Sequence, residues 1–174
     1  MRVPGWCTAA SVFVNDKAVT GVMPGRYLPL RRRWAAGDIV RLEVDMSPQI
    51  LEANARVVED NGRVAVQRGP LVYCLEQLDQ PQGVALSTVC FPASSAKGEA
   101  AFSETFEKDL LDGVVVLHHE GVVVQSSSER KALYFPHSAA PGMNSKIPLT
   151  FIPYYAWANR TPTPMMVWTP VVKG

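Results

Sequence analysis

Cysteine and glutamate side chains are the first groups in this chain that could carry out covalent chemistry. The chain has three cysteines, Cys7, Cys74 and Cys90, and Cys74 stands two residues before Glu76. Side chains two positions apart on a strand point to the same face, so the Cys74 thiol and the Glu76 carboxylate would be neighbours. A thiolate next to an acid can act as a nucleophile with an acid/base partner. The simpler alternative is a buried cysteine that fills space as a small apolar side chain.

Metal binding is the second chemistry that cysteine and histidine suggest. The three cysteines lack the close pairs of a local zinc site, and their odd number argues against a dense disulfide framework. His118 and His119 precede Glu120. Adjacent side chains on a strand point to opposite faces, so we expect the two imidazoles not to converge and to lie at a hairpin end in water. His137 stands alone beside a proline. We therefore predict no metal ligand and no catalytic residue in this chain.

A cluster of carboxylates raises the question of acid/base chemistry. Hydrolysis of a glycosidic bond uses two carboxylates at a defined separation across the bond. Glu104, Glu107, Asp109 and Asp112 lie close together in sequence, but closeness in sequence does not establish that geometry. A solvated loop or helix face is the commoner explanation for such a run.

Aromatic side chains offer a third chemistry, which is the stacking of a sugar ring. Packing in the core is the alternative, and we favour it because aromatics bury large areas. The best candidates for sugar contact are Trp157, Asn159 and Arg160, because a stacking group and two hydrogen-bonding groups lie together there. The aromatic residues considered are Trp6, Trp34, Tyr73, Tyr154, Tyr155, Trp157 and Trp168.

Composition excludes several classes of protein. The 174 residues include 17 Lys and Arg against 16 Asp and Glu, a net charge of +1, which gives no electrostatic footprint for nucleic acid. Arg31-Arg32-Arg33 is the basic run of the chain, and we assign it to a strand edge or face. No stretch reaches the roughly 18 apolar residues of a membrane span. Pro4-Gly5-Trp6 interrupts the start before the apolar core of a signal peptide could form.

Short strands with Gly and Pro between them dominate the pattern and predict an all-β chain. Residues 39–46 alternate most clearly, with Val40, Leu42, Val44 and Met46 facing a core. Asn61-Gly62 predicts a tight hairpin that pairs 55–59 with 63–67. A second hairpin is expected from 114–117 and 122–125, turning at Glu120-Gly121. Further strands are expected at 11–15, 71–75, 132–135, 149–152 and 165–168.

The helical signal is thin, and one segment suggests a domain boundary. Residues 103–111 could form a turn or two of helix with Ser103 as the N-cap. The segment Gln80-Pro-Gln-Gly83 interrupts the apolar pattern. We therefore divide the chain into a module at 1–79, a module at 80–164 and a terminal strand at 165–174.

Several sequence blocks, read together, resemble the C-terminal part of family 127 glycoside hydrolases, which are enzymes of the β-L-arabinofuranosidase type. The blocks run in order from the first residues to the last, and none of them is a catalytic motif. They are Arg2-Val-Pro-Gly-Trp6, Val12-Phe-Val-Asn15, Gly25-Arg-Tyr27, Arg33-Trp-Ala-Ala-Gly-Asp38, residues 42–46, residues 64–76, Ile152-Pro-Tyr-Tyr-Ala-Trp-Ala-Asn-Arg160 and Met166-Val-Trp168.

The resemblance implies two antiparallel β-sandwich modules behind a large helical barrel, the first module incomplete at its N-terminus. It implies that the terminal strand returns to the first module. It also implies that a zinc-bound cysteine nucleophile and a glutamate acid/base lie in the helical barrel, upstream of the blocks found here. The cysteine motifs of the family are absent from this chain, so we do not assign that role to Cys74 and Glu76.

Three functions are therefore compared. In the first, the chain is the non-catalytic β-sandwich part of a glycoside hydrolase that acts on terminal β-L-arabinofuranosides of plant-type glycans, and it braces the catalytic barrel, its expected partner. In the second, it is a free-standing carbohydrate-binding sandwich. In the third, it is a small hydrolase that uses Cys74 and Glu76. The first needs no cofactor in this chain, and zinc would belong to the barrel. A homodimer and either a cytoplasmic or an exported parent are compatible with the sequence.

Overall fold

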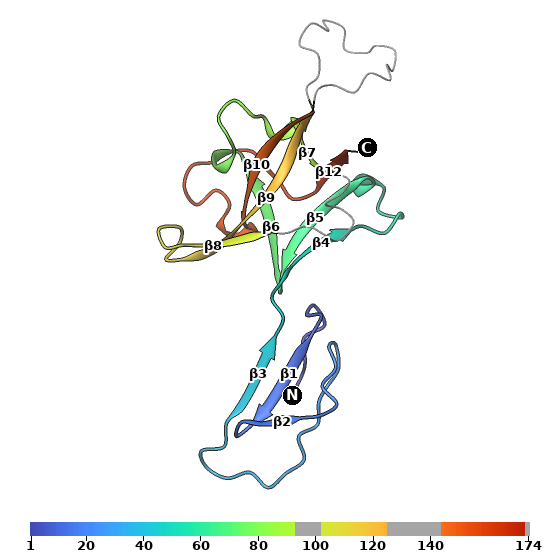
Figure 1. The fold of residues 1–174 in the computed structure, drawn as a ribbon, viewed down its shortest axis with the longest axis vertical. Coiled ribbons are helices and arrows are strands. Elements are labelled where there is room, and N and C mark those ends of the chain that lie inside the picture. Colours follow the sequence, from blue (N-terminus) through green and yellow to red (C-terminus); the bar gives the residue numbers. More distant parts are fainter. Residues whose placement is uncertain (93–101, 125–143, 173–174) are drawn as a thin grey trace, which may run out of the picture. The chain divides into compact units, whose positions relative to one another are not determined.

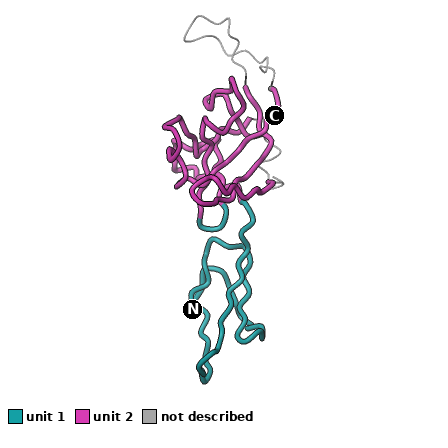
Figure 2. Tube along the Cα trace, turned by 90° about the vertical axis from the view of Figure 1, so that its left-hand side faces the viewer, with its two compact units in different colours: residues 1–48, 68–70 teal, residues 49–67, 71–174 magenta. Residues whose placement is uncertain are grey.

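The computed structural model describes residues 1–92, 102–124 and 144–172. These residues form two compact units, one made of residues 1–48 and 68–70 and the other of residues 49–67 and 71–174 (Figure 2). The first division between units falls between Pro48 and Gln49, earlier in sequence than the Gln80–Gly83 segment where we placed a boundary. The residues from Leu71 onward, across that segment, all belong to the second unit.

Unit 1 is built on one antiparallel sheet of three strands in the order β2-β1-β3. Its strands are β1 (Ala10–Val14), β2 (Lys17–Val19) and β3 (Val40–Val44). Asn15 and Asp16 both adopt positive φ, 49° and 62°, which is the backbone of a tight hairpin turn between β1 and β2. We predicted a sandwich module incomplete at its N-terminus, and the described residues of this unit form a single sheet.

The alternation predicted for β3 is present, but its burial is incomplete. Val40 and Leu42 stand opposite Val14 and Val12 of β1 in the pairing register. Val12 is 1% exposed, whereas Val40 is 39% exposed. The fully buried cluster of this unit is small and consists of Val3, Cys7, Val12 and Leu28. The apolar face of β3 is therefore only partly covered by the described residues.

The strand pairings of unit 2 close into a ring of six strands, which are labelled in Figure 1. The pairing runs β6-β10-β9-β7-β12-β5, and β5 pairs in turn with β6. Strands β4 and β11 flank β5 and β6, and β8 pairs with β9. The strands are β4 (Pro48–Glu52), β5 (Arg63–Arg68), β6 (Leu71–Glu76), β7 (Val89–Pro92), β8 (Ser103–Glu107), β9 (Val114–Val124), β10 (Asn144–Pro153), β11 (Met165–Met166) and β12 (Thr169–Val172).

The closed ring corrects the prediction of a second sandwich, and β12 is the reason. Thr169 pairs with Val64 of β5 in an antiparallel register, and Val171 pairs with Phe91 of β7 in a parallel one. One strand thus bonds two edges that would otherwise be free, which is what closes a sheet into a barrel. The prediction that the terminal strand returns to residues 1–79 agrees with these contacts, although residues 63–67 belong to unit 2.

Side chains that alternate along the strands fill the interior of the ring. On β6, Tyr73 and Leu75 enter the main core, whereas Cys74 packs in a second cluster on the other face. Such alternation is the ordinary geometry of a strand. The main core consists of Val64, Val66, Tyr73, Leu75, Leu86, Val89, Phe91, Leu117, Leu149 and Phe151.

Three local predictions are wrong. Residues 114–124 form one continuous strand rather than a hairpin, because β10 pairs with β9 from Leu117 to Val124 and Gly121 leaves room for the Leu149 side chain. Residues 103–107 form β8 rather than a helix. The partner that precedes β5 is β4, while residues 58–60 form a short 3-10 helix. The strand expected at 132–135 lies outside the described residues.

The helical segments are single 3-10 turns: η1 (Val58–Asp60), η2 (Gln77–Asp79), η3 (Leu86–Thr88) and η5 (Tyr154–Ala156). Within the described ranges, none of them has the length and hydrophobicity that a membrane-crossing helix requires. These turns serve as corners between strands.

His119 is the titratable group most closely packed among the aromatic rings of unit 2. Its ring centroid lies 5.1 Å from that of Phe91 and 4.8 Å from that of Phe102. Its Nδ1 atom is buried and has no hydrogen-bond partner among the described residues. Burial lowers the pKa of His119, and this effect outweighs the opposing backbone hydrogen bond and charge of Glu120.

We therefore expect stability to depend on pH through His119. The unfolded chain binds a proton at the ordinary histidine pKa of about 6.5, and the folded chain binds it only at lower pH. The free energy of unfolding should be at its full value above pH 6.5 and fall as the pH drops toward the folded pKa. Urea denaturation at several values between pH 5 and 8 measures this dependence. The unfolding free energy should change less with pH in His119→Leu than in the control His118→Gln. Equal slopes in the two variants would contradict this assignment.

Candidate functional site

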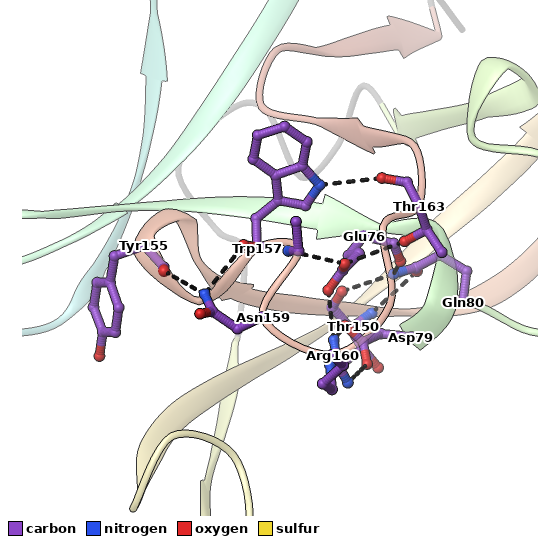
Figure 3. Close-up of polar contacts among 10 residues, drawn as sticks. Glu76, Asp79, Gln80, Thr150, Tyr155, Trp157, Asn159, Arg160 and Thr163 are labelled. Carbon is purple, nitrogen blue, oxygen red and sulfur yellow. Dashed lines mark hydrogen bonds and ion pairs between the residues drawn. The ribbon is translucent and has the colours of Figure 1, made fainter.

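The three candidate sugar-contact residues lie in one loop, residues 154–163, between β10 and β11. The Trp157 indole N–H donates to the Thr163 carbonyl at 3.1 Å. The Asn159 amide donates to the Tyr155 carbonyl at 3.0 Å and to the Trp157 carbonyl at 3.2 Å. These hydrogen bonds fold the loop on itself (Figure 3). Both donors of the Asn159 amide are therefore engaged inside the loop.

Arg160 fastens this loop to the end of β6. Its Nη1 and Nη2 atoms each lie 2.7 Å from an oxygen of Asp79, a two-pronged contact with one carboxylate. Nη2 also lies 2.5 Å from Oε2 of Glu76. Figure 3 shows the guanidinium held between the two acids. The Asp79 hydrogen bonds, followed by that of Glu76, raise the pKa of Arg160 further above its ordinary value despite partial burial, so the cation is fixed.

Glu76 is the buried centre of this network. Its side chain is 0% exposed. Oε1 accepts hydrogen bonds from the Ala158 backbone N–H at 3.2 Å and from the Thr163 hydroxyl at 3.1 Å. A buried carboxylate is tolerated when a cation and further donors satisfy its oxygens. The Glu76 carboxylate thus holds the middle of the 154–163 loop, at Ala158 and Arg160, and its end, at Thr163, to one point.

Gln80 joins the same region to β10. Its amide donates to the Glu76 carbonyl at 3.0 Å and to the Thr150 carbonyl at 2.9 Å. The Gln80 side-chain oxygen lies 3.4 Å from the Thr150 backbone N–H. Gln80 is 8% exposed. The corner η2, the strand β10 and the loop are consequently one hydrogen-bonded assembly.

The geometry around Cys74 does not fit a nucleophile. Cys74 and Glu76 do share a face of β6, but Cys74 is 0% exposed and packs among Leu110, Val114 and Ile152. Burial, followed by the charges of Glu76 and Asp79, raises the pKa of Cys74 to about 12. An active thiol needs the opposite shift, because the thiolate is the reactive form.

The cysteines also do not fit a zinc ion. Cys7 lies in the core of unit 1 and its thiol donates to the Pro4 carbonyl at 3.2 Å. Cys90 is on β7, and burial raises its pKa. Among the described residues no group of three or more His, Cys, Asp or Glu side chains is arranged to hold a metal ion.

The two histidines diverge, as the strand alternation predicted, although both are half-buried in mid-strand rather than at a hairpin end. The His118 Nδ1 atom lies 3.4 Å from the Thr150 hydroxyl, while His119 packs between phenylalanine rings. His118 also lines a pocket of about 330 Å³, together with Arg160, Asp79 and two acids of the cluster, Glu107 and Asp109.

An exposed aromatic pair lies at the start of the loop. The ring centroids of Tyr154 and Trp157 are 6.2 Å apart at an interplanar angle of 34°. Tyr154 is 46% exposed and Trp157 37% exposed. The exposed rings can stack on a planar apolar surface, whereas the Trp157 indole N–H and the Asn159 amide nitrogen already donate within the loop.

Sequence reasoning missed Glu76, Asp79 and Gln80 as parts of the site. Arg160 meets Glu76 across 84 residues and Asp79 across 81. The one available signal was a glutamate inside an apolar strand, because an acid is almost never fully buried unless it is paired.

Family comparison decides the class of this chain. The model of the glycoside hydrolase family 127 C-terminal domain matches residues 48–170. The model of the beta-L-arabinofuranosidase GH127 middle domain matches residues 1–46. The chain belongs to glycoside hydrolase family 127. The resemblance inferred from the sequence blocks is thereby confirmed, and the junction of the two family domains coincides with the division between the two compact units near Pro48.

Relatives of this family 127 chain are considerably longer. A non-reducing end beta-L-arabinofuranosidase of Bifidobacterium longum subsp. longum is 35% identical over 163 residues, which is 92% of this chain and 24% of that protein. A GH127 beta-L-arabinofuranosidase from Geobacillus stearothermophilus T6 superposes with a TM-score of 0.82 at 38% identity, covering 98% of this chain and 26% of that structure. A structure described as a glycoside hydrolase gives a TM-score of 0.85 at 31% identity, covering 99% and 27%. The chain thus spans about a quarter of each.

Removing Arg160 should destabilise unit 2 strongly. Arg160→Ala leaves the Glu76 carboxylate buried without its cation, which costs about 3 kcal/mol or more of unfolding free energy. The control is Arg41→Ala, because Arg41 pairs with Glu43 where both side chains are 51% exposed, and such surface pairs contribute about 1 kcal/mol or less. Urea denaturation measures both. Combining Arg160→Met with Glu76→Gln should recover part of the loss. Equal losses for Arg160→Ala and Arg41→Ala would contradict the assigned role of Glu76.

Proposed function

We propose that this family 127 chain is the non-catalytic β region of a glycoside hydrolase that releases terminal β-L-arabinofuranosides from plant-type glycans. The main support for this proposal is that the middle-domain and C-terminal-domain family models match residues 1–46 and 48–170. The activity in the proposal comes from relatives whose names state it, including the B. longum protein. Their much greater length leaves room for a separate catalytic domain, where the proposal also places the zinc ion.

The proposed role is to brace the catalytic helical barrel. The chemistry of the described polar residues supports this role. The Cys74 thiol is held in its protonated form, and the carboxylate of Glu76 is committed to Arg160 and to the loop. The Cys74 and Glu76 side chains therefore stabilise the β region and are not available to a substrate. A rigid, closed barrel suits a support for a neighbouring domain.

Two assays test this role. The purified 174-residue chain, supplied with zinc, should release no nitrophenol from a p-nitrophenyl β-L-arabinofuranoside, and Cys74→Ser should behave identically. In a full-length family 127 enzyme that contains this region, Arg160→Ala should lower the temperature of inactivation by several degrees, because about 3 kcal/mol of unfolding free energy is lost. The kcat/KM of the molecules that remain folded should be unchanged.

Two results would contradict the bracing role. Turnover by the isolated chain that disappears in Cys74→Ser would establish the small-hydrolase alternative. Loss of kcat in Arg160→Ala without loss of thermal stability would place Arg160 in the chemistry and overturn the bracing role.

Carbohydrate binding is a second candidate, which the exposed Tyr154–Trp157 pair favours. Trp157 would stack on a sugar ring through its exposed face. Titration of the chain with arabinan oligosaccharides should then quench tryptophan fluorescence, and Trp157→Ala should weaken affinity about tenfold, the effect of losing about 1.4 kcal/mol. Trp34→Ala is the matched control, since Trp34 is 47% exposed and lies in unit 1. An unchanged affinity in Trp157→Ala would exclude the Tyr154–Trp157 pair as a sugar-binding surface.

A further inference from the structure

A pocket beside Arg160 is distinct from the aromatic pair. Its volume is about 330 Å³, which falls within the range of small-ligand sites. Leu110, Val116 and Ile152, all buried, supply its apolar lining. Trp157 is not among the lining residues. The pocket therefore combines an aliphatic lining with the charged groups of the network.

Arg160 and Asp79 present a fixed donor beside a fixed acceptor in this pocket. A guanidinium has five N–H groups, and the contacts with Asp79 and Glu76 use three of them. Two N–H groups of Arg160 remain for a ligand. Each Asp79 oxygen accepts one hydrogen bond from Arg160 and keeps further lone-pair capacity. A donor next to an acceptor matches a pair of neighbouring hydroxyl groups, because each hydroxyl both donates and accepts.

The other polar lining groups are two carboxylates, an imidazole and a hydroxyl. Glu107 and Asp109 line the pocket and are exposed. His118, whose Nδ1 atom lies 3.4 Å from the Thr150 hydroxyl, also lines the pocket. Three carboxylates around one arginine that is already paired disfavour a carboxylate or phosphate ligand. The same acceptors suit the hydroxyl groups of a neutral ligand.

The geometry points to a binding pocket for an uncharged sugar residue, in which Arg160 and Asp79 contact one vicinal hydroxyl pair, Glu107 and Asp109 accept further hydroxyls, and Leu110, Val116 and Ile152 contact the C–H groups of the ring. The site would act as a subsite for one residue of a glycan. Only the choice of arabinose as the first sugar rests on the proposed function.

Binding is measured on the complete 174-residue chain by two-dimensional NMR and calorimetry. The probes are methyl β-L-arabinofuranoside and methyl β-D-glucopyranoside. Shifts should appear in the amides of residues 107–110, 116–118 and 150–152. The double variant Glu107→Gln/Asp109→Asn should weaken affinity about tenfold, since hydrogen bonds to charged groups are being weakened. Asp112→Asn is the matched control, because Asp112 lies in the same turn outside the pocket and should bind as the wild type does.

The outcomes separate this site from the proposals above. The pocket is supported if either glycoside binds and the double variant binds it more weakly. If only the glucoside binds, the choice of arabinose is wrong, although the pocket remains a sugar site. Affinity lost in Trp157→Ala but kept in the double variant would overturn the pocket in favour of the aromatic pair. Saturable binding of spermidine with no binding of either glycoside would overturn it in favour of a cation site. Absence of all binding would also overturn it, and would leave the bracing role untouched.

Discussion

The buried carboxylate of Glu76 is the constraint on which the architecture around β6 depends. A charge without water must find its partners within the protein, and those partners come from the distant 154–163 loop. Arg160, the Ala158 N–H and the Thr163 hydroxyl each contribute one contact. The position of the loop, and with it that of Trp157, is therefore determined by electrostatics as much as by packing.

The burial around Glu76 also explains why two residues that resemble catalytic groups have a structural role. Cys74 and Glu76 share a strand face, as a nucleophile and an acid would. Their surroundings give both a structural role, because apolar neighbours keep the thiol protonated and Arg160 occupies the carboxylate. The lining of the pocket beside Arg160 is different, since Glu107 at the end of β8 and Asp109 in the following turn are both exposed. Burial rather than residue type distinguishes the two groups of acids.

Sequence patterns predicted local geometry well where neighbours along the chain determine it. The all-β class, the strand at 11–15 and the opposite faces of His118 and His119 follow from the alternation of side chains along strands. The continuity of β9 through Gly121 did not, because a glycine signals a turn unless a partner such as Leu149 needs the space. The Arg160–Glu76 contact and the closure by β12 depend on residues about a hundred positions apart. Spacing in sequence does not predict contacts between such distant residues. The strand pattern therefore fits a sandwich and a barrel equally well.

Closure by β12 also sets an order of events during synthesis. Among the six strands of the ring, β12 leaves the ribosome last, yet it bonds both β5 and β7. Until it emerges, the nascent chain holds two unpaired edges that can recruit strands from other molecules. The closed state is consequently reached only after Thr169 to Val172 have left the ribosome, and chaperones that shield strand edges would act on this chain before then.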